Sequence, residues 1–182
     1  MNLENIITRV SDFIKRYRDT NCTISFTLGK YTTEFGFEKN LFQVEKYNRI
    51  LDLLQNCSTW DSTDSNTTEK FQSVPLKVVD KLIITCENGP YDIMVEASSI
   101  EGLVYVADDY IRQESIFKRK NHTFVLAKNS TRLVDETFYT ASIIADIPVD
   151  FTDTYIAHSS LLKITDLVCV CGAKENLSFT II

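Results

Sequence analysis

The densest group of chemically useful side chains is the basic run Lys118, Arg119 and Lys120, inside an otherwise β-forming segment at 116–126. In a strand, successive side chains point to opposite faces, so Lys118 and Lys120 would share one face and Arg119 would take the other. Such cations bind phosphate or carboxylate groups. The alternative is an exposed strand end with solvated lysines, whose charges the acidic pair at 135–136 could balance across a hairpin.

Other catalytic constellations are missing from the sequence. The chain has two histidines, His122 and His158, and no HExxH, GxSxG, Walker-loop or dinucleotide-binding pattern. No Cys and His residues have the spacing of a zinc site. A single histidine in a strand is more often a hydrogen-bonded structural residue than a ligand. The residues alone therefore indicate no familiar active site.

Composition limits the class of protein. Of the 182 residues 44% are hydrophobic, which is ample for a packed core, and 19 basic against 25 acidic side chains give a formal charge of −6. This acidity argues against a general nucleic-acid coat. No apolar run approaches the roughly 20 residues of a membrane helix. The five cysteines form no CxxC pair, and no secretory signal precedes them. We therefore expect a single intracellular domain over 1–182 that does not bind membranes.

Periodicity indicates which elements position these side chains. Apolar residues at helical spacing predict helices at 3–18 and 41–56, and polar–apolar alternation predicts a strand at 22–28. A polar stretch at 57–73 is expected to be a mobile loop, and 99–112 is ambiguous. Further strands are predicted at 76–87, 90–98, 114–126, 131–144, 154–165, 166–172 and 176–182. The order predicts an α+β domain with a large antiparallel sheet or closed barrel.

Five short segments resemble a known series of motifs. The first is Thr23-Ile-Ser-Phe-Thr-Leu-Gly-Lys30, which shares the frame Glu-x-Glu-x-Arg-(Leu/Phe)-Gly-Lys. The others are Tyr91-Asp-Ile-Met-Val95, Arg119-Lys-Asn-His-Thr-Phe124, Arg132-Leu-Val-Asp-Glu-Thr137 and Tyr155-Ile-Ala-His-Ser-Ser160. In order and spacing they are similar to the triphosphate tunnel metalloenzymes, specifically the RNA 5′-triphosphatases of mRNA capping in fungi, protists and large DNA viruses. The resemblance implies an antiparallel eight-stranded tunnel-like β-barrel, with an N-terminal helix and a second helix after the first strand.

In that family, paired glutamates hold a divalent metal ion, and inward arginines and lysines bind the triphosphate. The matching positions here carry mostly uncharged side chains; they are Thr23, Ser25, Thr27, Met94, Arg119, Asn121, Thr123, Asp135, Thr137, Ile156, His158 and Ser160. Hydroxyls and an imidazole do not replace several carboxylates as ligands of Mg²⁺ or Mn²⁺. The resemblance therefore implies a barrel without catalytic residues, cofactor or metal. The possible anion-binding residues are Lys118, Arg119, Lys120 and Arg132.

Three functions remain open at this point. The leading hypothesis is a catalytically degenerate barrel, acting as an accessory or scaffold subunit through a protein partner. By resemblance, the partner is a capping or RNA polymerase component in a viral or plasmid-like transcription apparatus. The first alternative is an active RNA 5′-triphosphatase with Mg²⁺ or Mn²⁺, whose rearranged ligands would come from the nearest other carboxylates, Glu34, Glu38, Glu96, Glu101, Asp146 and Asp150. The second is a non-catalytic barrel that binds an anion or nucleotide. An unrelated α+β domain is also compatible with the pattern.

Overall fold

The computed structural model describes residues 3–41, 43–56, 60–62, 67–88, 91–131, 136–147, 156 and 159. The helices are α1 (Leu3–Tyr17) and α2 (Val44–Gln55). The strands are β1 (Asn21–Thr32), β2 (Gly36–Glu38), β3 (Asp61–Ser62), β4 (Thr67–Asn88), β5 (Tyr91–Arg119), β6 (His122–Thr131) and β7 (Thr137–Ala145). Neither of these two helices is long and apolar enough to cross a membrane.

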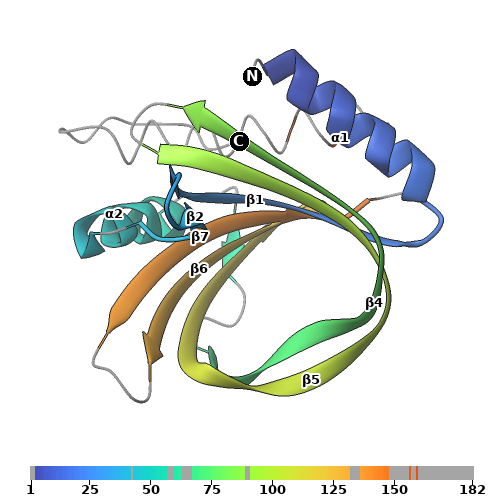
Figure 1. Ribbon diagram of the computed structural model, residues 1–182. Helices are drawn as coiled ribbons and strands as arrows, with labels where there is room; N and C mark the ends of the chain where they lie inside the picture. The colour runs from blue at the N-terminus through green and yellow to red at the C-terminus, as the bar shows by residue number, and fades with distance from the viewer. Residues whose placement is uncertain are drawn as a thin grey trace.

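A single antiparallel sheet joins all seven described strands. Strand β5 has 29 residues and organises the sheet. Its first part pairs with β1, from Asn21 opposite Ile100 to Gly29 opposite Asp92, and its last part pairs with β6. Strand β7 lies between β1 and β6 and pairs with both. Strand β4 forms a long hairpin ribbon with β5 that curves strongly, and α1 lies outside this curve (Figure 1).

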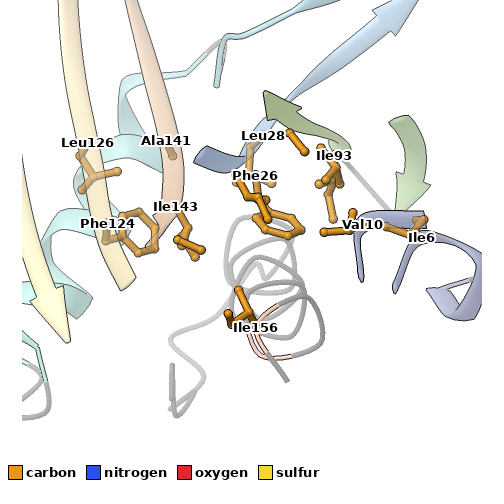
Figure 2. Close-up of a cluster of buried hydrophobic side chains, with 14 of the residues drawn as sticks. Ile6, Val10, Phe26, Leu28, Ile93, Phe124, Leu126, Ala141, Ile143 and Ile156 are labelled. Carbon is orange, nitrogen blue, oxygen red and sulfur yellow. The ribbon is translucent and has the colours of Figure 1, made fainter. Parts of the chain in front are cut away.

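The hydrophobic core lies between the helices and one face of the sheet. Apolar side chains at helical spacing on α1, such as Ile6 and Val10, are fully buried. They meet every second residue of β1, including Phe26 and Leu28, and Ile93 of β5 (Figure 2). Burying each large apolar side chain stabilises the fold by about 1.5–3 kcal/mol relative to exposure. This packing leaves only the opposite face of β1 available to bind a ligand or partner.

Helix α2 and one aromatic residue extend the same core along β6 and β7. The ring of Tyr47 on α2 lies 4.9 Å from that of Tyr139 on β7, centroid to centroid. Trp60 meets Phe124 of β6 edge to face, at 5.8 Å between centroids. Ile156, in a helical conformation, is buried in the same cluster (Figure 2). The face of the sheet that carries the core is therefore covered by α1, α2, Trp60 and Ile156.

Several predictions about the elements are confirmed. The predicted helices at 3–18 and 41–56 correspond to α1 and α2, and the predicted strand at 22–28 lies within β1. The hairpin predicted at Asn88 joins β4 to β5, with Asn88 opposite Tyr91. The α+β class and the antiparallel sheet are as expected.

Other predictions about the strands are wrong. The ambiguous stretch 99–112 is part of β5. The predicted strand 114–126 is two strands, because Lys120 has a φ of 52° and turns the chain between β5 and β6. Of the single strand predicted at 131–144, Thr131 belongs to the end of β6, and the part from Thr137 onward is confirmed as β7. The predicted polar loop 57–73 contains β3 and the start of β4.

The C-terminal prediction can be compared at two positions. We predicted a strand at 154–165, but Ile156 and Ser159 are helical, and Ile156 is buried beside the core rather than placed in the sheet. The predicted strands 166–172 and 176–182 lie outside the described residues. Of the eight strands that the resemblance implies, the described part of the chain holds seven.

Candidate binding site on the inner face of the sheet

The face of the sheet opposite the core, here called the inner face, carries mostly polar side chains. Residues directly opposite one another in an antiparallel pair share a face. Because Ile24, Phe26 and Leu28 point into the core, the residues that alternate with them on β1 point away from the core and lie on the inner face. Their partners on β5 follow from the register, in which Thr23, Ser25 and Thr27 lie opposite Ser98, Glu96 and Met94. Lys81 of β4 lies opposite Ser98 and joins the same face.

A group of three charged side chains, here called the Glu96 cluster, lies on this face. The Lys81 Nζ atom is 3.1 Å from Glu96 Oε1, and the Lys39 Nζ atom is 4.0 Å from Glu96 Oε2. Lys39 comes from the chain just after β2, so three segments meet here. The Glu96 side chain is 24% exposed, against 45% for Lys81 and 52% for Lys39. The cluster therefore has one more positive than negative charge and remains accessible to solvent.

A second polar group lies where β5, β6 and β7 meet. Arg112 donates from Nε to Asn129 Oδ1 at 3.0 Å, and its Nη1 atom is 3.7 Å from Glu114 Oε1. Asn129 is 1% exposed, and its Nδ2 atom donates at 3.4 Å to both the Phe138 carbonyl oxygen and Thr140 Oγ1. The cation of Arg112 is thus held by two neighbours from the sheet itself.

A third carboxylate, Asp92, has a structural role at the end of the inner face. It is 2% exposed, and its Oδ2 atom accepts the Tyr31 backbone N–H at 2.8 Å. Its Oδ1 atom is 3.9 Å from Lys30 Nζ. These contacts tie the start of β5 to the curved end of β1. Each of the three carboxylates described on this face, at positions 92, 96 and 114, therefore has a cationic neighbour.

A cleft of about 390 Å³ opens beside the Glu96 cluster. Its polar lining includes Thr23, Lys81, Glu96 and Ser98, and the Thr23 and Ser98 hydroxyl oxygens are 3.2 Å apart. Its apolar lining comes from Pro75, Val78, Ile100 and Leu103. It is a concave surface on the inner face that combines charged, hydroxyl and apolar side chains.

The structure brings together only some of the residues suggested by sequence. Thr23, Ser25, Thr27, Met94 and Thr123 lie on the inner face, as does Lys118, which is opposite Thr123. Arg119 instead shares the side of the buried Phe117, and its Nη1 atom is buried without a hydrogen bond. Thr137 is exposed at the start of β7, on the side of the sheet opposite to Thr140. Arg132, Asp135, His158 and Ser160 lie outside the described residues.

The turn between β5 and β6 explains why the basic run does not form one charged strand face. Lys120 occupies the turn itself. Asn121 is buried there, where its Nδ2 atom donates to the Asp146 carbonyl oxygen at 3.3 Å and its own carbonyl oxygen accepts the Asp146 N–H at 2.8 Å. Asn121 therefore stabilises the turn and does not face the inner side.

Three cationic side chains of the inner face escaped the sequence analysis: Lys39, Lys81 and Arg112. Lys81 lies in a segment predicted as a strand, and the alternation of that strand places Lys81 and Ile83 on one side. The sequence held no signal for the pairing register that brings Lys81 to Glu96. Among the described residues, no three His, Cys, Asp or Glu side chains lie close enough together to hold a metal ion.

Comparison with known proteins used both sequence and structure. Neither a family model nor a curated protein matches the sequence. The structure of the S. pombe Pct1 RNA triphosphatase superimposes with a TM-score of 0.65 over 90% of this chain and 92% of that chain, at 10% identity. This chain has the triphosphate-tunnel fold.

A second structure with the tunnel fold agrees. The S. pombe Pct1 RNA triphosphatase in complex with the Spt5 CTD gives a TM-score of 0.56 at 10% identity, over 89% of this chain and 86% of that chain. At such low identity, the superposition establishes the fold alone. The activity has to be argued from this chain's own side chains.

Proposed function

We propose that this chain is a catalytically degenerate tunnel-fold domain that acts as an accessory or scaffold subunit by binding a protein partner in a transcription or mRNA-capping apparatus. The observation that carries the proposal is the Glu96 cluster. A carboxylate with an ammonium group beside each oxygen is a poor ligand for a divalent cation, because the two ammonium groups offset its charge and repel the cation. Its cross-strand neighbour is the hydroxyl of Ser25 rather than a second carboxylate.

Three cations of the inner face, Arg112, Lys81 and Lys39, support the same conclusion. Catalysis of triphosphate hydrolysis needs cations aimed at the phosphoryl oxygens, with their hydrogen-bond donors free. Arg112 already donates to Asn129 and contacts Glu114. Lys81 and Lys39 are directed to Glu96. A triphosphate entering this face would have to displace these contacts, and it would meet the carboxylates as well.

A surface for a protein partner is present on the β4–β5 ribbon. Large apolar side chains there are 38–78% exposed; they are Leu76, Val78, Val79, Leu103, Val104, Tyr105 and Val106. A gathering of exposed large apolar side chains on one hairpin is typical of protein–protein interaction sites. The Pct1 structure with the Spt5 CTD offers a precedent for a tunnel-fold protein that binds another protein.

The alternative function is an active, metal-dependent RNA 5′-triphosphatase, favoured by the similarity to Pct1. The decisive assay measures phosphate release from triphosphate-ended RNA with Mg²⁺ or Mn²⁺, with and without EDTA. We expect no release above the protein-free background. Release that requires the metal and disappears with EDTA would overturn the non-catalytic assignment. The Glu96→Gln variant is the control, because contaminating phosphatase activity would be the same in both preparations.

The partner is tested by affinity capture from the native source. We expect RNA polymerase or guanylyltransferase components to be recovered with the wild-type chain and lost with Tyr105→Asp, which places a charge on the ribbon. Val44→Asp is the matched control, because Val44 is 40% exposed but lies at the start of α2. Recovery of unrelated proteins alone, or equal recovery with Tyr105→Asp, would contradict the proposal.

A further inference from the structure

The cleft beside the Glu96 cluster combines features that plain surface ion pairs do not have. Its lining includes a carboxylate and an ammonium group whose atoms are 3.1 Å apart. Hydroxyls from Thr23 and Ser98 lie on the same face, and apolar side chains from β4 and β5 complete the lining. The volume of about 390 Å³ exceeds that of a single amino-acid side chain. The cleft thus suits a ligand with both apolar faces and a polar edge.

Charge excludes the simplest ligands. Lys81 and Lys39 repel a simple cation, and the Glu96 carboxylate between them weakens the attraction of the cluster for a free phosphate or carboxylate. The favoured ligand is therefore uncharged where it meets the pair, with hydrogen-bond donors for the carboxylate beside an acceptor for the ammonium group. Glu96 can supply them, since each carboxylate oxygen has two lone pairs and each contacts one lysine here.

We propose that this cleft binds a guanine base. The Watson–Crick edge of guanine presents two adjacent N–H donors beside a carbonyl oxygen. The N–H donors match the carboxylate of Glu96, and the carbonyl oxygen matches the ammonium group of Lys81. Adenine and uracil offer this carboxylate–ammonium pair one fewer hydrogen bond.

The apolar lining provides for the faces of the base. Leu103 and Val78 belong to paired strands and line the cleft together with Pro75. A flat heterocycle gains dispersion contacts against such side chains without losing hydrogen bonds. The inference does not depend on the non-catalytic assignment, since it concerns a base and needs neither a metal ion nor a triphosphate.

Binding of GMP, AMP, UMP and ribose 5-phosphate to the whole chain, measured by titration calorimetry with EDTA present, tests the proposal. We expect GMP to bind about tenfold more tightly than AMP or UMP, as one additional charge-assisted hydrogen bond predicts. Ribose 5-phosphate should bind undetectably. Equal affinities for the three nucleotides, or no GMP binding at millimolar concentration, would overturn the assignment.

Variants distinguish the residues that bind the edge of the base from those that pack against its faces. Glu96→Gln should weaken GMP binding about tenfold and bring it close to AMP. Glu114→Gln is the matched control, because Glu114 is also an ion-paired glutamate on the inner face of β5. Leu103→Ala, at a residue that is half exposed, should weaken all three nucleotides to a similar extent. An equal loss with Glu114→Gln would contradict the specific role of Glu96.

The source of the guanine is distinguished with short RNA. A trinucleotide beginning with guanosine is compared with the all-adenosine trinucleotide. Tight binding of the first identifies an RNA-borne base, and binding of GMP alone identifies a free nucleotide; both support the guanine site. Because GMP has no γ-phosphate, failure of either binding test leaves the hydrolysis assay and its conclusion untouched.

Discussion

Ser25 of β1 and Glu96 of β5 lie directly opposite each other on the inner face of the sheet. The pair places a single carboxylate, flanked by Lys81 and Lys39, beside a neutral hydroxyl. Two carboxylates at this position would form the beginning of a cage for a divalent ion, whereas one carboxylate with two lysines forms an ion-paired cluster with one excess positive charge. The identity of the residue opposite Glu96 therefore sets how many carboxylates meet at this position.

The first prediction concerns Ser25→Glu, which puts a second carboxylate opposite Glu96. Like charges directly opposite in a sheet destabilise it by roughly 0.2–1 kcal/mol. We expect a lower melting temperature without metal and a partial recovery with Mn²⁺, measured by thermal denaturation. Thr123→Glu is the control, because Thr123 lies opposite Lys118 and gains no carboxylate neighbour. A shift with Mn²⁺ of the same size in both variants would argue against a created metal site.

The second prediction concerns the hydrogen bond that joins α1 to β4. The Tyr17 hydroxyl donates to Asp80 Oδ2 at 2.5 Å, and Asp80 Oδ1 accepts the Lys81 N–H at 2.8 Å. The bond to Asp80 raises the pKa of Tyr17, and the same bond, with that from the Lys81 N–H, lowers the pKa of Asp80. We expect Tyr17→Phe to lower the melting temperature at neutral pH, and Tyr31→Phe, at a half-exposed tyrosine, to leave it unchanged.

The pH range of this effect follows from the two directions. A lowered pKa for Asp80 contributes stability above its unfolded value, near pH 4, and the contribution is lost as the pH falls through the folded value. A raised pKa for Tyr17 contributes stability below about pH 10, and that is lost as the pH rises through the folded value. The difference between Tyr17→Phe and wild type should therefore shrink at both extremes. A constant difference from pH 3 to pH 11 would contradict the assignment.

The third prediction concerns Gly29, where β1 approaches β2. A Cβ atom at this position would contact the Glu38 carbonyl oxygen and come within 2.7 Å of the Phe37 ring. Backbone cannot move aside cheaply in a paired ribbon, so Gly29→Ala should cost about 1–3 kcal/mol of unfolding free energy. Urea denaturation measures this loss. Thr33→Ala, at an exposed residue between the two strands, is the control, and an equal effect of both variants would refute the steric explanation.

The fourth prediction concerns Asn129, the buried member of the second polar group. Removing its amide leaves the Arg112 Nε–H and the Phe138 carbonyl oxygen without this partner. Such a loss costs about 1–3 kcal/mol for a buried polar group. We expect Asn129→Ala to lower the unfolding free energy by that amount in urea denaturation. Asn48→Ala, on the exposed side of α2, should change it by less than about 0.5 kcal/mol.

Prediction from sequence succeeded where a local pattern is itself the cause of the structure. The apolar stripe of α1 and the alternation of β1 fixed which side chains become buried, and Asn88 marked the hairpin. Prediction from sequence failed where the same local pattern is compatible with two different structures. The segment 116–126 alternates as a strand should, yet the left-handed conformation of Lys120 breaks it into β5 and β6. The turn at Lys120 leaves Arg119 on the core side of the sheet and places Asn121 in the turn.

The amino-acid sequence by itself determined the class of the fold, the inward position of Thr23, Ser25 and Thr27, and the scarcity of carboxylates among them, because side-chain alternation and residue type are local properties. Only the tertiary structure decided that Glu96 faces Ser25 and is held by Lys81 and Lys39, because strand register and the path of the chain after β2 are set by packing between distant segments. Charges that are separate along the chain thereby become one ion-paired cluster beside a cleft.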